Sequence, residues 1–78
     1  LVCHGAVDPY VKPEAVTGFQ AEMEAAGVDY QFIAYAGAVH AFTQVGAGSD
    51  PSRGAAYNEA ADRRSWQAMK TFLAEVLE

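Results

Sequence analysis

Two short apolar segments on either side of a helical pattern constrain the fold of this chain more than any other feature. Residues Leu1–His4 form an apolar run that stops at Gly5, and residues Val28–Tyr35 form a second run with apolar side chains on both faces. Between these runs, apolar residues recur at helical spacing, namely Val16, Phe19, Met23 and Ala26. Pro13 suits the first turn of that helix, and Gly27 suits its end. The order strand–helix–strand predicts a βαβ unit with two parallel strands.

The rest of the chain predicts a long loop followed by a second helix. Residues Gly37–Tyr57 are rich in Gly, Ser, Asp and Pro, which favour turns. Asn58 is a good N-cap, and Glu59 and Asp62 complement the positive end of the helix dipole. The helix that follows carries an apolar stripe of Trp66, Met69, Leu73 and Val76, broadened by Phe72 and Leu77. The predicted fold class is therefore α/β, a βαβ-α arrangement with two parallel strands and two main helices.

The length of the chain limits it to one small domain. We assign residues 1–78 to a single, partial α/β domain. Although 51% of the residues are apolar, Ala is the most frequent of them, so the predicted core is thin. Two strands are too few for an independently stable sheet, and they leave open edges. Because the chain also starts abruptly with apolar residues, we expect a fragment of a larger fold whose sheet is extended by a partner chain.

Charge and cysteine content argue against several classes of partner. The formal net charge is −5 and the basic residues are scattered, apart from Arg63 and Arg64, so no nucleic-acid partner is expected. No apolar run approaches the ~20 residues that span a bilayer, so no membrane partner is expected. The first residues lack the basic and apolar regions of a signal peptide. The single cysteine, Cys3, excludes an internal disulfide and favours a reducing, cytoplasmic location.

Two polar residues lie just beyond the carboxyl ends of the predicted strands. Asp8 follows the first strand and His40 follows the second. In parallel α/β sheets this edge is where catalytic groups gather, and an Asp can hold an imidazole in the tautomer that acts as a base. The residues alone leave two plainer interpretations open. Asp8 before Pro9 is an ordinary turn residue, and a lone histidine in a loop is often structural.

Three segments together resemble the C-terminal third of dienelactone hydrolase family proteins. They are His4–Val11 (HGAVDPYV), Tyr35–Phe42 (YAGAVHAF) and Ala56–Trp66 (AYNEAADRRSW), and the resemblance extends over essentially the whole chain. It implies an α/β-hydrolase fold whose triad of a Cys or Ser nucleophile, an Asp and a His cleaves ester or lactone bonds through an acyl-enzyme. Asp8 matches the family's acid, and His40 matches its base.

The chain also departs from the pattern of that family. The nucleophile of such enzymes lies on a sharp turn in a Gly-x-Cys/Ser-x-Gly motif, which this sequence lacks. Cys3 lies within a predicted strand, so we interpret it as a small apolar residue rather than the nucleophile. An Arg that follows the His in dienelactone hydrolases is absent from the stretch Thr43–Val45. The substrate of a complete relative is therefore not required to be a dienelactone.

A metal site is a further possibility that the spacing does not support. His4, Asp8 and His40 could form one if they converged, but their positions do not match characteristic ligand spacings. We therefore predict no metal and no cofactor.

Two functions of different classes remain open on the sequence. In the first, the chain is the C-terminal portion of an ester or lactone hydrolase, with acid Asp8 and base His40 but no nucleophile, and is inactive alone. In the second, it is a non-catalytic α/β module that self-associates through its open sheet edges. A third, weaker possibility is an assembly in which a second chain donates the nucleophile.

Overall fold

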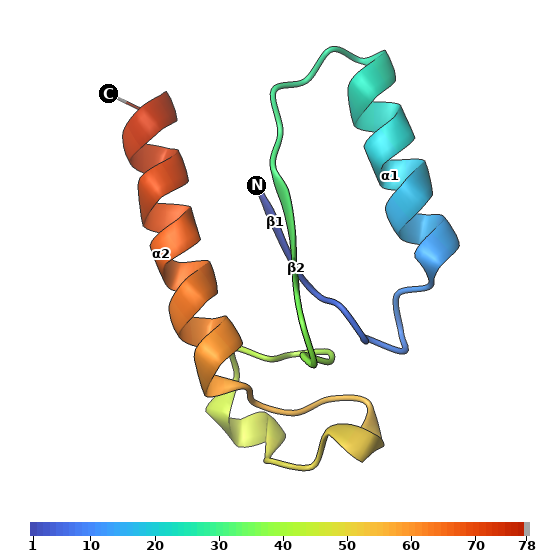
Figure 1. Cartoon of the computed structure of the whole chain (residues 1–78), viewed down its shortest axis with the longest axis vertical. Helices are drawn as coiled ribbons and strands as arrows, with labels where there is room; N and C mark the ends of the chain where they lie inside the picture. The colour runs from blue at the N-terminus through green and yellow to red at the C-terminus, as the bar shows by residue number, and fades with distance from the viewer. Residues whose placement is uncertain (78) are drawn as a thin grey trace.

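The computed structural model describes residues 1–77 as an α/β arrangement (Figure 1). Its strands and main helices are β1 (Val2–Gly5), α1 (Pro13–Ala25), β2 (Phe32–Tyr35) and α2 (Glu59–Val76). Two short 3-10 helices, η1 (Val45–Ala47) and η2 (Pro51–Arg53), lie in the segment between β2 and α2. The predicted fold class, with two parallel strands and two main helices, is confirmed.

The two strands pair in parallel along their whole length. Val2 lies opposite Phe32, and the register continues to Gly5 opposite Tyr35. The predicted start of the second strand at Val28 is wrong, because β2 begins at Phe32. Since β1 begins at Val2, residues 28–30 have no partner strand to pair with, although the backbone N–H of Val2 still donates to the carbonyl of Gln31 at 2.9 Å.

The two main helices cover opposite faces of this small sheet (Figure 1). On the α1 side, the ring of Phe19 packs against Phe32 with ring centroids 6.2 Å apart. On the α2 side, a buried cluster contains Tyr35, Ala38, Phe42 and Ala61, with Cys3 and Ile33 packed against it. A helix therefore flanks each face of β2, as is typical of a strand in an α/β sheet, although Ala34 on the α1 side stays exposed.

The helix ends follow local sequence signals. The Asn58 side chain accepts a hydrogen bond from the backbone N–H of Ala61 at 3.0 Å, and so caps α2. Gly27 has a φ of +67°, the left-handed conformation that ends many helices. Gly18 lies inside α1 without a close packing contact, because a Cβ built there would have no neighbour within 4 Å.

The segment 37–57 is more ordered than the loop predicted from its composition. It contains both 3-10 helices and an isolated parallel bridge between His40 and Ala55. The apolar stripe of α2 is only partly used in packing, because Trp66, Leu73 and Val76 are exposed. Within residues 1–77, the structure contains no helix whose length and hydrophobicity would let it cross a membrane.

Candidate active site

The loops that leave the carboxyl ends of β1 and β2 are held together by backbone hydrogen bonds. The N–H of Ala6 donates to the carbonyl of Tyr35, and the N–H of Val7 donates to the carbonyl of Ala38, both at 3.0 Å. At Gly5 the two segments approach so closely that a Cβ would lie 2.6 Å from the carbonyl oxygen of Val39. A glycine is needed here because any side chain would push the two loops apart.

Asp8 is the buried member of the candidate site. Its side chain is only 7% exposed. One carboxylate oxygen, Oδ1, accepts from the backbone N–H of Tyr10 at 2.8 Å, which is an Asx-type turn. The other oxygen, Oδ2, lies 3.0 Å from Nδ1 of His40. Both oxygens therefore have a partner, and the turn fixes the direction in which the carboxylate points.

His40 is fixed by its backbone and exposed at its side chain. Its N–H donates to the carbonyl of Gly54, and its carbonyl accepts from the N–H of Ala56, both at 3.1 Å. The next residue, Ala41, has a φ of +59°, a conformation that non-glycine residues rarely adopt. The imidazole itself is 54% exposed. The main chain thus holds the ring at the edge of the sheet while solvent reaches it.

The contact between these two side chains determines the chemistry that the site can perform. An ionised carboxylate can only accept hydrogen bonds, so the proton of the pair lies on Nδ1 of His40. Nε2 then keeps its lone pair and can accept a proton from a bound group. The structure brings Asp8 and His40 together from positions 32 residues apart along the chain. This arrangement is suited to general acid–base chemistry.

Cys3 and the serines have other surroundings. The Cys3 thiol accepts a hydrogen bond from the Tyr35 hydroxyl at 3.8 Å. Burial, followed by that hydrogen bond, raises the pKa of Tyr35 to about 12, so the phenol stays protonated as a donor. The hydroxyl of Ser52 donates to Asp50, and that of Ser65 to the backbone carbonyl of Asp62. Neither serine is hydrogen-bonded to a histidine that could activate it.

His4 lies on the α1 side of the sheet, where it lines the same cavity as Asp8. Its ring packs against Phe32 with centroids 5.5 Å apart. Across residues 1–77, no group of three or more His, Cys, Asp or Glu side chains is placed to hold a metal ion.

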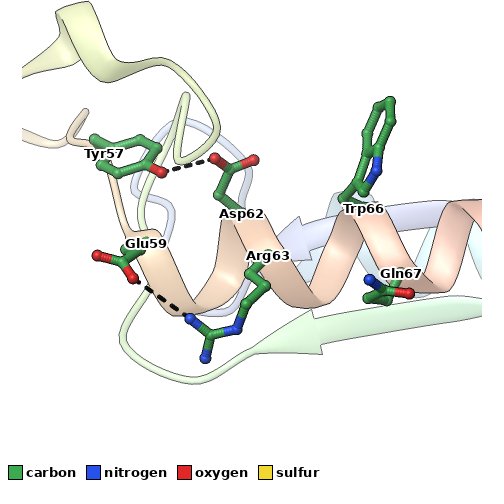
Figure 2. A pocket seen from close by; sticks show the side chains of 6 residues that line it. All are labelled: Tyr57, Glu59, Asp62, Arg63, Trp66 and Gln67. Atoms are coloured by element: carbon green, nitrogen blue, oxygen red, sulfur yellow. Dashed lines mark hydrogen bonds and ion pairs between the residues drawn. The ribbon is translucent and has the colours of Figure 1, made fainter.

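A separate cavity of about 330 Å³ lies at the start of α2 (Figure 2). Four of its polar side chains form two pairs. The Tyr57 hydroxyl donates to Asp62 at 2.8 Å, and Arg63 forms an ion pair with Glu59 at 3.4 Å. The hydrogen bond to Asp62 raises the pKa of the Tyr57 phenol above its ordinary value. The acidic and basic groups of this cavity are therefore engaged with one another, and Trp66 and Gln67 complete its lining (Figure 2).

Three neighbours of the Asp8–His40 pair were not foreseen from the sequence. Tyr10 lies against the imidazole with ring centroids 5.2 Å apart, Gly54 accepts from the His40 backbone, and Ala41 has its unusual φ. The turn sequence Asp8-Pro9-Tyr10 is a signal that Tyr10 lies near the Asp8 carboxylate. Nothing in the sequence indicates that residues 54–56 return to His40.

Comparison with known proteins identifies the class and then the family. Parallel strands covered by helices on both faces correspond to part of an α/β-hydrolase fold. A solved dienelactone hydrolase-like promiscuous phosphotriesterase from metagenomic libraries superposes with a TM-score of 0.88 and is 41% identical, over 96% of this chain and 31% of that chain. The family model for the dienelactone hydrolase family matches residues 1–77, and the chain belongs to that family.

The relatives are longer than this chain. An uncharacterized protein of Caenorhabditis elegans is 41% identical over 75 residues, which are 95% of this chain and 47% of that protein. The chain therefore spans about half the length of this curated relative and about a third of the solved structure.

Proposed function

We propose that the chain supplies the acid and the base of a dienelactone-hydrolase-like enzyme that cleaves small esters or lactones. One observation carries the proposal: buried Asp8 contacts Nδ1 of exposed His40 at 3.0 Å, beyond the carboxyl ends of two neighbouring parallel strands. This pair provides an oriented imidazole with a free Nε2, which acyl transfer by a Cys or Ser nucleophile requires.

In the proposed reaction, Nε2 of His40 accepts one proton and gives it up again in each half of the cycle. Nε2 removes the proton of the nucleophile as its sulfur or oxygen bonds to the ester carbonyl carbon. The bond to the leaving alkoxide then breaks, and the alkoxide takes the proton from Nε2. Water repeats the sequence and releases the acid, while Asp8 stabilises the imidazolium formed in each half. Nucleophile and oxyanion donors would come from another chain segment or a second chain, since Cys3 is engaged with Tyr35.

The 78-residue chain should therefore be inactive by itself. We expect p-nitrophenyl acetate to be hydrolysed at the same background rate by the purified chain and by its His40→Ala variant. A rate well above buffer that disappears in His40→Ala would contradict this incompleteness and would reveal a nucleophile within the chain.

A chimera tests the proposed roles directly. The matching segment of the metagenomic phosphotriesterase, which is 41% identical, is replaced by this chain. If the chimera hydrolyses an activated ester, Asp8→Asn and His40→Ala should each lower kcat on the order of 10²–10⁴-fold. His4→Gln is the matched control, because His4 packs against Phe32 and takes no part in the hydrogen bonds of Asp8 and the His40 side chain. A folded, active chimera that tolerates His40→Ala would overturn the proposal.

The second candidate is a non-catalytic module that self-associates. It is favoured by the two-stranded sheet, whose outer edges have no partner strand among residues 1–77, and by the exposed apolar side chains of α2. A cavity of about 450 Å³ between Leu1, Cys3, Trp66 and Met69 continues this apolar surface. A second copy would cover both features.

A further inference from the structure

The Tyr10 ring lies against the His40 imidazole, close to Asp8. Its ring and the His40 imidazole are 5.2 Å apart between centroids, with their planes at 73° in a T-shaped contact. Such perpendicular aromatic pairs are favourable because the positive edge of one ring meets the negative face of the other. Tyr10 is 66% exposed, so packing in the core does not account for its position.

Two further contacts fix where the Tyr10 ring lies. Its own backbone N–H donates to Oδ1 of Asp8 at 2.8 Å, which ties Tyr10 to the acid. On another side the ring reaches Gly54, where an added Cβ would lie 3.2 Å from Cε2 of Tyr10 and 3.3 Å from its hydroxyl. Gly54 in turn accepts a hydrogen bond from the backbone N–H of His40. Asp8, Tyr10, Gly54 and His40 therefore form a closed ring of contacts.

We propose that Tyr10 is a positioning residue that holds the His40 imidazole with Nδ1 toward Asp8 and Nε2 free. A single hydrogen bond holds the imidazole of His40 to Asp8, and about half of the side chain is exposed to solvent. A half-turn about the Cβ–Cγ bond would replace Nδ1 with a carbon and break that bond. The Tyr10 ring hinders this turn because it occupies the adjacent space. The proposal rests on the proposed function, in which Nε2 is the proton acceptor.

The imidazole itself provides the readout. Two-dimensional ¹⁵N–¹H NMR of the 78-residue chain at mildly alkaline pH reports which ring nitrogen carries the proton. Only two histidines are present, so His4→Gln assigns the His40 signals. We expect an Nδ1–H tautomer in the unmodified chain and in Tyr10→Phe, which keeps the ring. In Tyr10→Ala, the population without the Asp8 bond should rise about two- to tenfold, the range that one aromatic contact supports.

Gly54→Ala provides an independent variant that displaces Tyr10 without removing it. The new methyl group would press on the Tyr10 ring, and the population of His40 without the Asp8 bond should rise as in Tyr10→Ala. Because Gly54 also has a positive φ of +88°, the control is Gly27→Ala, where φ is +67° and a Cβ meets nothing within 4 Å. The control should leave the His40 tautomer unchanged.

The outcomes separate this inference from the proposed function. If Asp8→Asn alters the His40 tautomer while Tyr10→Ala and Gly54→Ala do not, Tyr10 has no positioning role and the Asp8–His40 pair stands. If Asp8→Asn itself changes nothing, the pair fails, and the proposed function fails with it. Far-UV circular dichroism of each variant verifies that the fold is retained; because Tyr10 is mostly exposed, we expect Tyr10→Ala to fold.

Discussion

At the scale of single residues, the candidate site depends on Gly5, which has no side chain. A Cβ on Gly5 would lie 2.6 Å from the carbonyl oxygen of Val39 and 2.8 Å from that of Ala38, both immediately before His40 in the chain. These atoms belong to backbone that hydrogen bonds hold in place, so they cannot move aside cheaply. The distance between the loop that carries Asp8 and the loop that carries His40 is therefore set at Gly5.

We predict that Gly5→Ala lowers the free energy of unfolding by about 1–3 kcal/mol, as overpacking does elsewhere. Urea unfolding followed by circular dichroism measures it. Gly18→Ala is the matched control: its Cβ meets nothing within 4 Å and it lies inside α1, so it should gain about 0.5–1 kcal/mol. Gly5→Ala with unchanged stability would show that the close approach of the two loops is not required.

The raised pKa of Tyr35 makes the free energy of unfolding depend on pH in the alkaline range. Burial is the main cause that raises its pKa from 10.0 to about 12. The unfolded chain therefore loses this proton first, so the contribution of Tyr35 is complete below pH 10 and is lost as pH rises toward 12. Urea midpoints measured between pH 9 and about 12 should fall less steeply in Tyr35→Phe. The slope should not vanish, because hydrogen bonds to Glu24 and Asp62 also raise the pKa of Tyr30 and Tyr57. An identical slope in Tyr35→Phe and in the unmodified chain would show that the Tyr35 phenol is exposed to solvent in the folded state.

At the scale of elements, the two helices differ in how they begin. Asn58 caps α2 through its side chain, whereas Lys12 at the same position of α1 makes no capping hydrogen bond although its backbone is extended. We predict that Asn58→Ala costs about 1 kcal/mol of unfolding free energy and that Lys12→Asp gains a similar amount. Chemical unfolding measures both. Equal stability of Asn58→Ala and the unmodified chain would mean that α2 begins independently of its cap.

Elements were predictable from the sequence where local signals determine them. Pro13 and Asn58 place the starts of both helices correctly, because capping and proline act through the nearest turn. The start of the second strand was predicted at Val28 because side-chain alternation says nothing about the length of the partner strand. The apolar stripe of α2 was found, yet its exposure at Trp66 depends on tertiary contacts that periodicity does not encode.

At the scale of the whole molecule, the candidate site was predictable only in part. Asp8 and His40 could be paired in advance because parallel topology brings the carboxyl ends of neighbouring strands to one edge. The contact of Tyr10 with His40, and the return of Gly54 to the His40 backbone, depend on the path of residues 45–57. That path is set by two 3-10 helices whose composition indicated only turns.

At the same scale, the exposed apolar surface of α2 is where the self-association proposed above would bury area. Trp66 is 57% exposed on α2, beside the apolar cavity that includes Leu1 and Met69. Assembly that covers this surface stabilises the folded state by mass action, so the urea midpoint should rise with protein concentration.

Trp66→Gln should reduce that concentration dependence, while Val45→Gln should not, because Val45 is 75% exposed on η1 and does not line that cavity. Sedimentation velocity at the same concentrations identifies the species responsible. A monomer at every concentration, with one cooperative and concentration-independent transition, would rule out the self-associating module. It would also mean that the thin core centred on Tyr35, Phe42 and Ala61 is sufficient to hold Asp8 and His40 in place.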